Sequence, residues 1–205
     1  MKVGVMGGTF DPIHLGHLIV AEEARIRLSL EQVIFVPTGD PWLKAGREIS
    51  PAHHRMAMVK LAISSNPFFR VSPIEIERPG PSYSVVTLEA LKATFPPEAE
   101  FYFILGMDSL RDLHRWHSPE RLFSLCTLVT FARPGFLHFD TASLDKISAG
   151  ASRKIVLIEG PLIDISGTEL RRRLAQGNSV CYWVHPEVEE YIRRHGLYQP
   201  AVARS

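Results

Sequence analysis

The sequence has few cysteines and no long apolar run, and these absences exclude several classes of protein. Its 205 residues include two cysteines, Cys126 and Cys181, which form no C-x-x-C pair, so neither a zinc site nor a redox motif is indicated. We expect both to be buried or half-buried free thiols of a reducing compartment. No stretch approaches the roughly 18 apolar residues of a membrane span, and the start lacks a signal-peptide core. A cytoplasmic protein is predicted.

The sequence also lacks an excess of positive or negative charge. The net charge is +1 at pH 7, and no basic block of six or more residues occurs, which argues against nucleic acid or a membrane surface as a partner. Arg171, Arg172 and Arg173 form a short cluster, of which we expect the last two to lie on a solvated face. The length suits one domain, residues 1–205, and leaves the oligomeric state open.

What the chain does contain is a regular alternation of short apolar segments and helix-like segments. Apolar, β-prone runs predict strands, whereas helical spacing with start and stop signals predicts helices. The predicted strands are 2–6, 32–36, 69–76, 101–105, 127–132 and 154–158. The predicted helices are 15–28, 51–65, 85–94, 165–175 and 186–195. A short helix or turn region is predicted at 110–116 and another at 119–125, and one or two helical turns at 144–147.

This alternation predicts an α/β fold with an open parallel sheet and helices on both faces. The last helices are expected to form a small helical C-terminal part. Ligands of such sheets bind beyond the carboxyl ends of the strands. Unusual residues lie shortly after five predicted strands, at 7–9, 40–44, 106–108, 133 and 164–168. We therefore expect these loops to converge on one binding edge.

The turn at 7–17, G-G-T-F-D-P-I-H-L-G-H, carries the strongest chemical signal. Gly7 and Gly8 allow close backbone approach, and amides there and at the following helix start can hold an anion. The turn matches neither the P-loop nor the G-x-G-x-x-G fingerprint. His14 and His17 are three residues apart, so both can face one side of a helix and donate to a phosphate. Metal binding is the alternative chemistry, but no third ligand stands at an obvious spacing; incidental histidines on a surface turn are the remaining reading.

The complete string resembles the signature of the H-x-G-H nucleotidyltransferase superfamily, and most closely that of the bacterial nicotinate-nucleotide adenylyltransferase family. Later segments agree in order. I-S-G-T-E-L-R at 165–171 is similar to the superfamily motif I-S-S-T-x-[IL]-R, and G-P-S-Y-S at 80–84 resembles the family's G-P-S-Y-T. L-G-M-D-S-L at 105–110 with Trp116, and R-P-G at 133–135, also have counterparts. The resemblance covers residues 2–198 and implies a Rossmann-like fold.

The resemblance assigns roles by position. The implied catalytic residues, which stabilise charge on the ATP phosphates, are His14, His17, Lys44 and Arg171. The implied ATP-binding residues are Gly7, Gly8, Thr9, Gly106, Asp108, Ser166, Thr168 and Arg171. Residues implied for the second substrate, nicotinic acid mononucleotide, are Tyr83, Trp116 and Arg133. Mg²⁺ is expected to be carried on the ATP phosphates, without a metal site of the protein's own.

Some positions have a purely structural reading, and some depart from the family pattern. Ser166 can begin a capping box, and Trp116 can be a partly buried aromatic residue. Tyr83 can be a turn residue that packs on the next helix, and Arg133 can form an ion pair. Gly167 stands where the superfamily usually has serine. Ser84 replaces threonine, and W-L in place of P-H precedes the lysine at 44.

The reaction that the resemblance implies is transfer of AMP from ATP to nicotinic acid mononucleotide, giving deamido-NAD and pyrophosphate. No motif in the sequence pairs a serine or cysteine nucleophile with a histidine base. Other members of the superfamily act on nicotinamide mononucleotide or phosphopantetheine or transfer cytidylyl groups, and these remain alternatives. A non-catalytic nucleotide-binding module is another. A tRNA synthetase, which carries a related histidine signature, is not expected, because the sequence is short and shows no second motif or basic tail for RNA.

Overall fold

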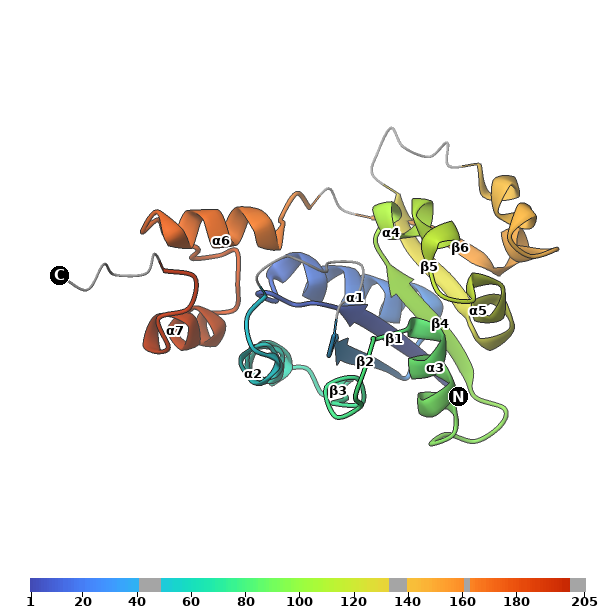
Figure 1. The fold of residues 1–205 in the computed structure, drawn as a ribbon, viewed down its shortest axis with the longest axis horizontal. Coiled ribbons are helices and arrows are strands. Elements are labelled where there is room, and N and C mark those ends of the chain that lie inside the picture. The colour runs from blue at the N-terminus through green and yellow to red at the C-terminus, as the bar shows by residue number, and fades with distance from the viewer. Residues whose placement is uncertain (41–48, 133–139, 161–162, 200–205) are drawn as a thin grey trace.

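Six parallel strands form one sheet in the order β3-β2-β1-β4-β5-β6 (Figure 1). The computed structural model describes residues 1–40, 49–132, 140–160 and 163–199. The strands are β1 (Lys2–Gly8), β2 (Gln32–Pro37), β3 (Phe69–Val71), β4 (Glu100–Leu105), β5 (Thr127–Ala132) and β6 (Ile155–Glu159). Strand order reverses direction at β1, so the crevice between β1 and β4 is the expected ligand site of such a sheet.

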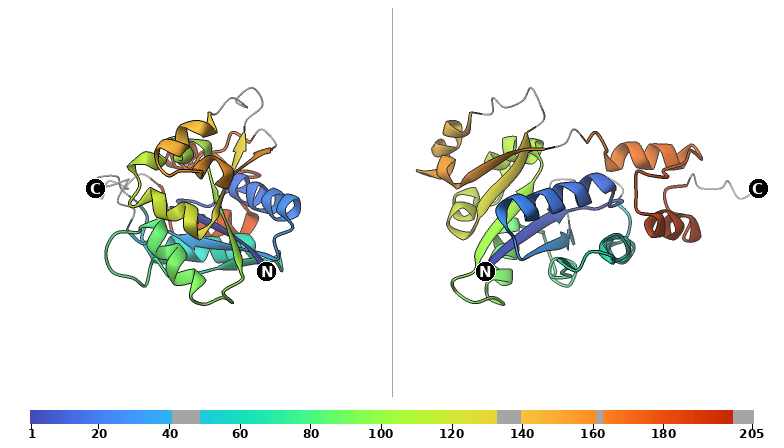
Figure 2. Two further views of the ribbon diagram at one scale, coloured as in Figure 1. Left: turned by 90° about the vertical axis from the view of Figure 1, so that its right-hand side faces the viewer. Right: turned by 180° about the vertical axis from the view of Figure 1, so that it is seen from behind.

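Helices cover both faces of the sheet, as predicted. They are α1 (Leu15–Leu28), α2 (Ala52–Ile63), α3 (Ser84–Lys92), α4 (Met107–Arg111), α5 (Pro119–Leu125), α6 (Gly167–Ala175) and α7 (Pro186–Arg194), with short 3₁₀ segments η2 (Leu113–Arg115), η3 (Thr141–Lys146) and η4 (Ala151–Lys154). Figure 2 shows α1 in front of the strands when the molecule is seen from behind. The α6–α7 segment lies beyond the carboxyl ends of β1 and β2 (Figure 1).

The core divides into two layers because successive residues of a strand point to opposite faces. In β2, Val33 and Phe35 pack with the layer that contains α1, α2 and α7. Ile34 and Val36 pack with the layer that contains α3, α4 and α5. Both faces of the strands are therefore apolar, which explains why these runs read as continuously hydrophobic.

Two expectations about the strands and the cysteines need correction. The third strand ends at Val71 rather than at residue 76, because Pro73 has no N–H for the ladder and a turn follows, in which the Glu77 amide donates to the Pro73 carbonyl at 2.9 Å. The region 110–116, expected to be a short helix or turn, contains the end of α4 and the segment η2. Cys126 is buried, and burial raises the pKa of its thiol to about 12, but Cys181 is exposed.

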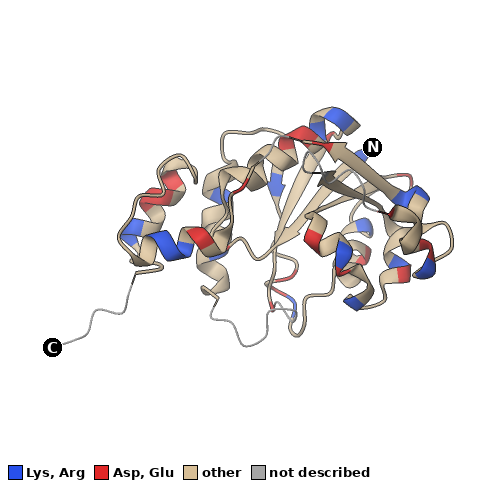
Figure 3. Ribbon diagram, turned by 90° about the horizontal axis from the view of Figure 1, so that it is seen from above, with Lys and Arg blue, Asp and Glu red and all other residues tan. Residues whose placement is uncertain are grey.

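Charges of both signs lie side by side on the helices, and this arrangement is visible in Figure 3. Arg172 forms an ion pair with Glu169 at 2.7 Å on the exposed face of α6, which agrees with the solvated position expected for it. Arg173, expected to be solvated, instead lies over the Trp183 ring at 5.0 Å and donates to the Ser179 carbonyl. Within the described ranges, no helix has the length and apolarity needed to cross a membrane.

Candidate active site

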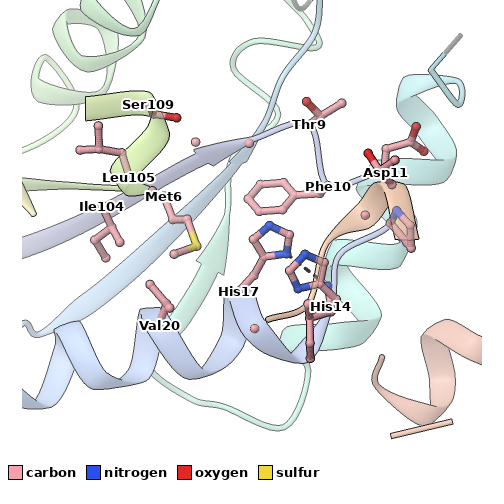
Figure 4. A pocket seen from close by; sticks show the side chains of 18 of the residues that line it. Met6, Thr9, Phe10, Asp11, His14, His17, Val20, Ile104, Leu105 and Ser109 are labelled. Atoms are coloured by element: carbon pink, nitrogen blue, oxygen red, sulfur yellow. Dashed lines mark hydrogen bonds between the residues drawn. The ribbon is translucent and has the colours of Figure 1, made fainter. Parts of the chain in front are cut away.

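The turn after β1 places two imidazole rings at the start of α1. The rings of His14 and His17 stack with centroids 3.7 Å apart (Figure 4). The His14 amide donates to Nδ1 of His17 at 3.2 Å, so the neutral His17 ring carries its proton on Nε2. The Phe10 ring meets His17 edge-on at 5.0 Å. Packing and a backbone hydrogen bond therefore hold His17 in one tautomer and orientation.

His14 is the more deeply buried of the pair. The residue is 7% exposed, and desolvation lowers the pKa of its imidazole to about 4. At neutral pH it is therefore an uncharged ring that donates one N–H. Its Nδ1 is buried without a hydrogen-bond partner among the residues that the structure describes. A buried polar atom of this kind gains stability from a polar ligand.

The position of the His14 ring explains why residue 16 is a glycine. A Cβ on Gly16 would lie 3.0 Å from Nδ1 of His14 and 3.2 Å from a methyl group of Ile163. Glycine at this position keeps the space beside the unpartnered nitrogen clear. Gly8 has a similar constraint, because its Cβ would lie 3.0 Å from the Phe10 ring. Both glycines therefore serve close packing around the turn.

Helix α6 brings Arg171 to the same turn from the far end of the chain. Its Nη1 donates to the Asp11 carbonyl at 2.6 Å, and its Nη2 is 3.4 Å from the Thr168 hydroxyl. A Cβ on Gly167 would lie 3.0 Å from the same carbonyl. Glycine at the position where the superfamily has serine thus lets the first turn of α6 approach Asp11 closely.

Asp11 joins the turn to three other parts of the chain. Its carboxylate accepts hydrogen bonds from the Tyr198 hydroxyl at 2.6 Å and the Ser50 amide at 3.3 Å, and Arg171 Nη1 lies 3.9 Å away. Burial and the nearby Asp11 charge raise the pKa of Tyr198 far above its usual range. Tyr198 therefore stays protonated and acts as a donor.

Arg55 supports the other side of the turn. The residue is only 2% exposed and donates to the carbonyls of Thr9 and Ser50, both at 2.8 Å. Burial lowers the pKa of its guanidinium, while nearby acidic groups, with Asp11 the largest contributor, oppose this change. The signature turn is thus held by buried polar contacts from α2 and from the C-terminal segment.

These elements enclose a cavity of about 410 Å³ that we call the phosphate pocket. Its polar wall combines the histidine pair with Arg171 and Thr168, and its floor is the backbone of residues 7–9. Asp11 is the one carboxylate among the described residues that line it, and that group is already engaged. The site therefore presents hydrogen-bond donors and positive charge, which suit a polyphosphate.

A second cavity of about 220 Å³, here called the acceptor pocket, adjoins the first. The two share a wall made of Gly7, Gly8, Thr9, Leu105, Gly106 and Ser109. Aromatic rings flank the acceptor pocket: Trp116 lies edge-on to Phe103 at 6.1 Å, and Tyr83 stacks on His117 at 4.2 Å. Flat apolar surfaces of this type suit a planar ring.

Glu75 is a buried carboxyl group in the wall of the acceptor pocket. It is 6% exposed, and burial raises its pKa although hydrogen bonds from Thr87 and Ser82 and the Gly39 amide oppose this change. The Thr87 hydroxyl donates to Oε1 at 2.7 Å. The Ser82 hydroxyl oxygen accepts from the amides of Gly39 and Asp40. Glu75 therefore ties the 39–40 segment to the start of α3.

The structure gathers most, but not all, of the residues predicted for the site. Those that line one or both pockets are Gly7, Gly8, Thr9, His14, His17, Tyr83, Gly106, Trp116, Thr168 and Arg171. Ser166 lines neither pocket; its hydroxyl caps α6 by accepting from the Glu169 amide at 3.2 Å. The Asp108 side chain is 95% exposed beside Arg111 and also lines neither. Lys44 and Arg133 lie outside the described residues.

Sequence reasoning missed several residues that the structure places in or around the two pockets. Asp11 stands within the signature string, yet its use as a hub depends on partners that are 39, 160 and 187 positions away. Ser109 follows the Gly106 turn and lines both pockets. Glu75, His117 and Tyr198 carried no local signal beyond their residue types.

The parallel sheet, the histidine pair and the donor-lined pocket define an α/β nucleotidyltransferase. The profile of a family described as cytidylyltransferase-like matches residues 5–173. The probable nicotinate-nucleotide adenylyltransferase of Dehalococcoides mccartyi strain 195 is 48% identical over 198 residues, 97% of each chain. That of Roseiflexus sp. strain RS-1 is 46% identical over 197 residues, 96% of this chain and 98% of the other. The chain belongs to the nicotinate-nucleotide adenylyltransferase family.

A solved structure agrees on the fold. The nicotinic acid mononucleotide adenylyltransferase of Plasmodium falciparum, complexed with NaAD, has a TM-score of 0.77 against this chain. The match covers 96% of this chain and 97% of the other at 23% identity. This likeness supports the Rossmann-like sheet, which the sequence resemblance predicted.

Proposed function

We propose that this protein transfers an adenylyl group from ATP to nicotinic acid mononucleotide, as a step of NAD biosynthesis. A 5′-phosphate oxygen of the mononucleotide attacks the α-phosphorus of ATP. The bond from that phosphorus to the bridging oxygen breaks on the opposite side, and pyrophosphate leaves. The products are deamido-NAD and pyrophosphate, and no protein nucleophile takes part.

The observation that carries this proposal is the common wall of the two pockets. A donor-rich pocket next to an aromatic pocket can hold a triphosphate and a planar-ring mononucleotide so that their phosphates meet at the wall. Holding two reactants in line contributes roughly 7–11 kcal/mol to lowering a barrier in favourable cases. The backbone of residues 7–9 and Ser109, which line both pockets, would lie beside the reacting phosphates.

The donors of the phosphate pocket would stabilise charge as the bond breaks. His17 presents the Nε2–H that its tautomer provides, and His14 has an unpartnered Nδ1. Arg171 adds a permanent positive charge, and Lys44 is expected to add another. Positioning and such preorganised donors are the main sources of catalysis in phosphoryl-type transfers.

Mg²⁺ fits this reaction as a companion of ATP. The donors in the phosphate pocket are mainly nitrogen groups, whereas Mg²⁺ prefers oxygen ligands. Asp11, the lining carboxylate, is held by Tyr198 and Ser50. The ion would therefore be bound mainly by the phosphate oxygens of ATP and would neutralise part of their charge, while Arg171 and the histidines orient the chain of phosphates.

The proposal is tested by release of pyrophosphate. The purified protein is incubated with Mg-ATP and, separately, with nicotinic acid mononucleotide, nicotinamide mononucleotide and phosphopantetheine. We expect release with a pyridine mononucleotide and formation of the corresponding dinucleotide. Release only with phosphopantetheine would assign a different acceptor. Binding of ATP without release in any mixture would indicate a non-catalytic nucleotide-binding module.

A further inference from the structure

Arg173, the last arginine of the cluster at 171–173, makes contacts that neither of the two pockets requires. Its Nε and Nη2 both donate to the Ser179 carbonyl, at 3.1 and 3.0 Å. Its guanidinium also lies over the Trp183 ring, 5.0 Å from the centroid. A planar guanidinium that grips one carbonyl with two donors and stacks on an aromatic face is well suited to hold a segment in one shape.

The segment that Arg173 contacts contains a strained turn. The Trp183 amide donates to the Val180 carbonyl at 3.0 Å and closes the turn. Tyr182 has a φ of 66°, which is in the left-handed region that disfavours residues with a Cβ. Tyr182 is 88% exposed, so its own packing offsets little of this cost. Such a conformation persists where its surroundings fix it, and Arg173 contacts the chain on both sides of Tyr182, at Ser179 and at Trp183.

The turn presents its last carbonyl to the start of helix α1. The Leu15 amide donates to the Trp183 carbonyl at 2.9 Å. Leu15 is the first residue of α1, and His14 is its N-cap, so the Leu15 N–H is one of the donors that a helix cannot satisfy by itself. Leu15 stands directly after His14 and two residues before His17. The position of the Trp183 carbonyl therefore helps to fix the backbone that carries both imidazoles.

We infer that Arg173 is a positioning residue of the enzyme: by holding the turn that ends at Trp183, it keeps the start of α1 and the histidine pair in the reactive geometry. The inference rests on the proposed adenylyl transfer, in which Arg173 acts through Trp183 and Leu15 and does not touch the nucleotide. Arg171, two residues earlier, reaches the same stretch at the Asp11 carbonyl. Helix α6 thus supports the backbone before and after His14.

Two variants test this role without any need for turnover. Arg173→Met keeps the length of the side chain but has neither charge nor donors, and Arg173→Lys keeps the charge with a single donor group. Hydrogen exchange of the Leu15 amide reports its bond to the Trp183 carbonyl, and the ¹⁵N chemical shifts of the His17 ring report its tautomer. In Arg173→Met we expect Leu15 to exchange about tenfold faster, because a local opening becomes less costly, and His17 to show a mixture of tautomers.

The kinetic test uses Mg-ATP and nicotinic acid mononucleotide, with rates normalised to the folded fraction from unfolding curves. A displacement of about 1 Å can cost about 10² in rate, so we expect kcat to fall about tenfold in Arg173→Met while the KM for Mg-ATP stays within about twofold. Arg173→Lys should lie between this variant and the wild type. Arg172→Met is the matched control, because it removes the neighbouring arginine, which pairs with Glu169, and it should behave as the wild type does.

Several outcomes overturn the inference. An unchanged kcat in a less stable protein would leave Arg173 a purely structural role, and a raised KM for Mg-ATP at unchanged kcat would mean that Arg173 contacts the nucleotide itself. An equal loss in Arg172→Met would reflect positive charge alone, and unchanged Leu15 exchange would break the link to α1. If Arg173→Met does not fold, Arg173→Lys carries the same comparisons. Absence of turnover in the wild type, with Leu15 protected as expected, would contradict the proposed function instead.

Discussion

The hydroxyl of Tyr198 donates a 2.6 Å hydrogen bond to Oδ1 of Asp11, although 187 positions separate the two residues. The contact fastens the C-terminal segment to the turn that carries the histidine pair. The backbone carbonyl of Asp11 also accepts a hydrogen bond from Arg171. The two ends of the chain therefore shape the phosphate pocket together.

Tyr198→Phe should destabilise the protein and disturb the turn. A buried carboxylate loses its shortest hydrogen bond, which typically costs about 1–3 kcal/mol. The free energy of unfolding from urea titration is the measurement, with turnover recorded in parallel. Tyr182→Phe is the matched control, because Tyr182 is 88% exposed. Equal stability of Tyr198→Phe and the wild type would show that the contact is not formed in solution.

Gly16→Ala should lower turnover although it improves helix propensity. Alanine in a helix is favoured over glycine by roughly 0.5–1 kcal/mol, but here its Cβ would meet Nδ1 of His14 at 3.0 Å. The His14 ring must then move from its place beside the pocket. Steady-state turnover and thermal unfolding separate the two effects. A variant that is more stable and fully active would contradict the close contact.

His17→Ala should lose about 10²- to 10³-fold in turnover, the usual cost of removing one preorganised donor. ATP affinity should stay within roughly tenfold, because Arg171 and the backbone of the turn remain. Single-turnover kinetics and nucleotide binding, measured separately, test this expectation. His53→Ala removes an exposed histidine that does not line the phosphate pocket and serves as the control. Near wild-type turnover in His17→Ala would remove this residue from the mechanism.

Acid should destabilise the protein through His14. Its pKa is lowered from 6.5 to about 4 in the folded state, so the unfolded state binds more protons between those values. The contribution is fully present above pH 6.5 and is lost as the pH falls toward 4. Linkage predicts a loss of about 2 kcal/mol between pH 7 and pH 5 from this one group.

The measurement is the free energy of unfolding at several pH values in the wild type and in His14→Gln. The variant has no imidazole at this position and should show a flatter profile over the same interval. His114→Gln, which replaces an exposed imidazole, should keep the wild-type slope. Identical slopes in His14→Gln and the wild type would mean that His14 is not desolvated in the folded protein.

Local patterns in the sequence determined the elements of the fold and the character of the phosphate pocket. Apolar runs marked the buried strands, because a parallel sheet covered on both faces leaves no polar side. Segments that follow strands marked the binding edge, and residues 7–17 with 165–171 indicated phosphate chemistry and the family. The prediction was wrong where two local signals compete: the apolar pattern continues past Pro73, but the strand ends at Val71.

Only the tertiary structure decided which distant residues meet. The tertiary structure packs the C-terminal segment against the turn after β1, which brings Arg171 and Tyr198 to Asp11, and it joins the two pockets along one wall. It also leaves Asp108 exposed and places His117 in the acceptor pocket. These contacts span from tens of positions to nearly the whole chain and depend on side-chain direction. No periodicity or spacing in the sequence encodes such a contact, because each results from the packing of separate elements.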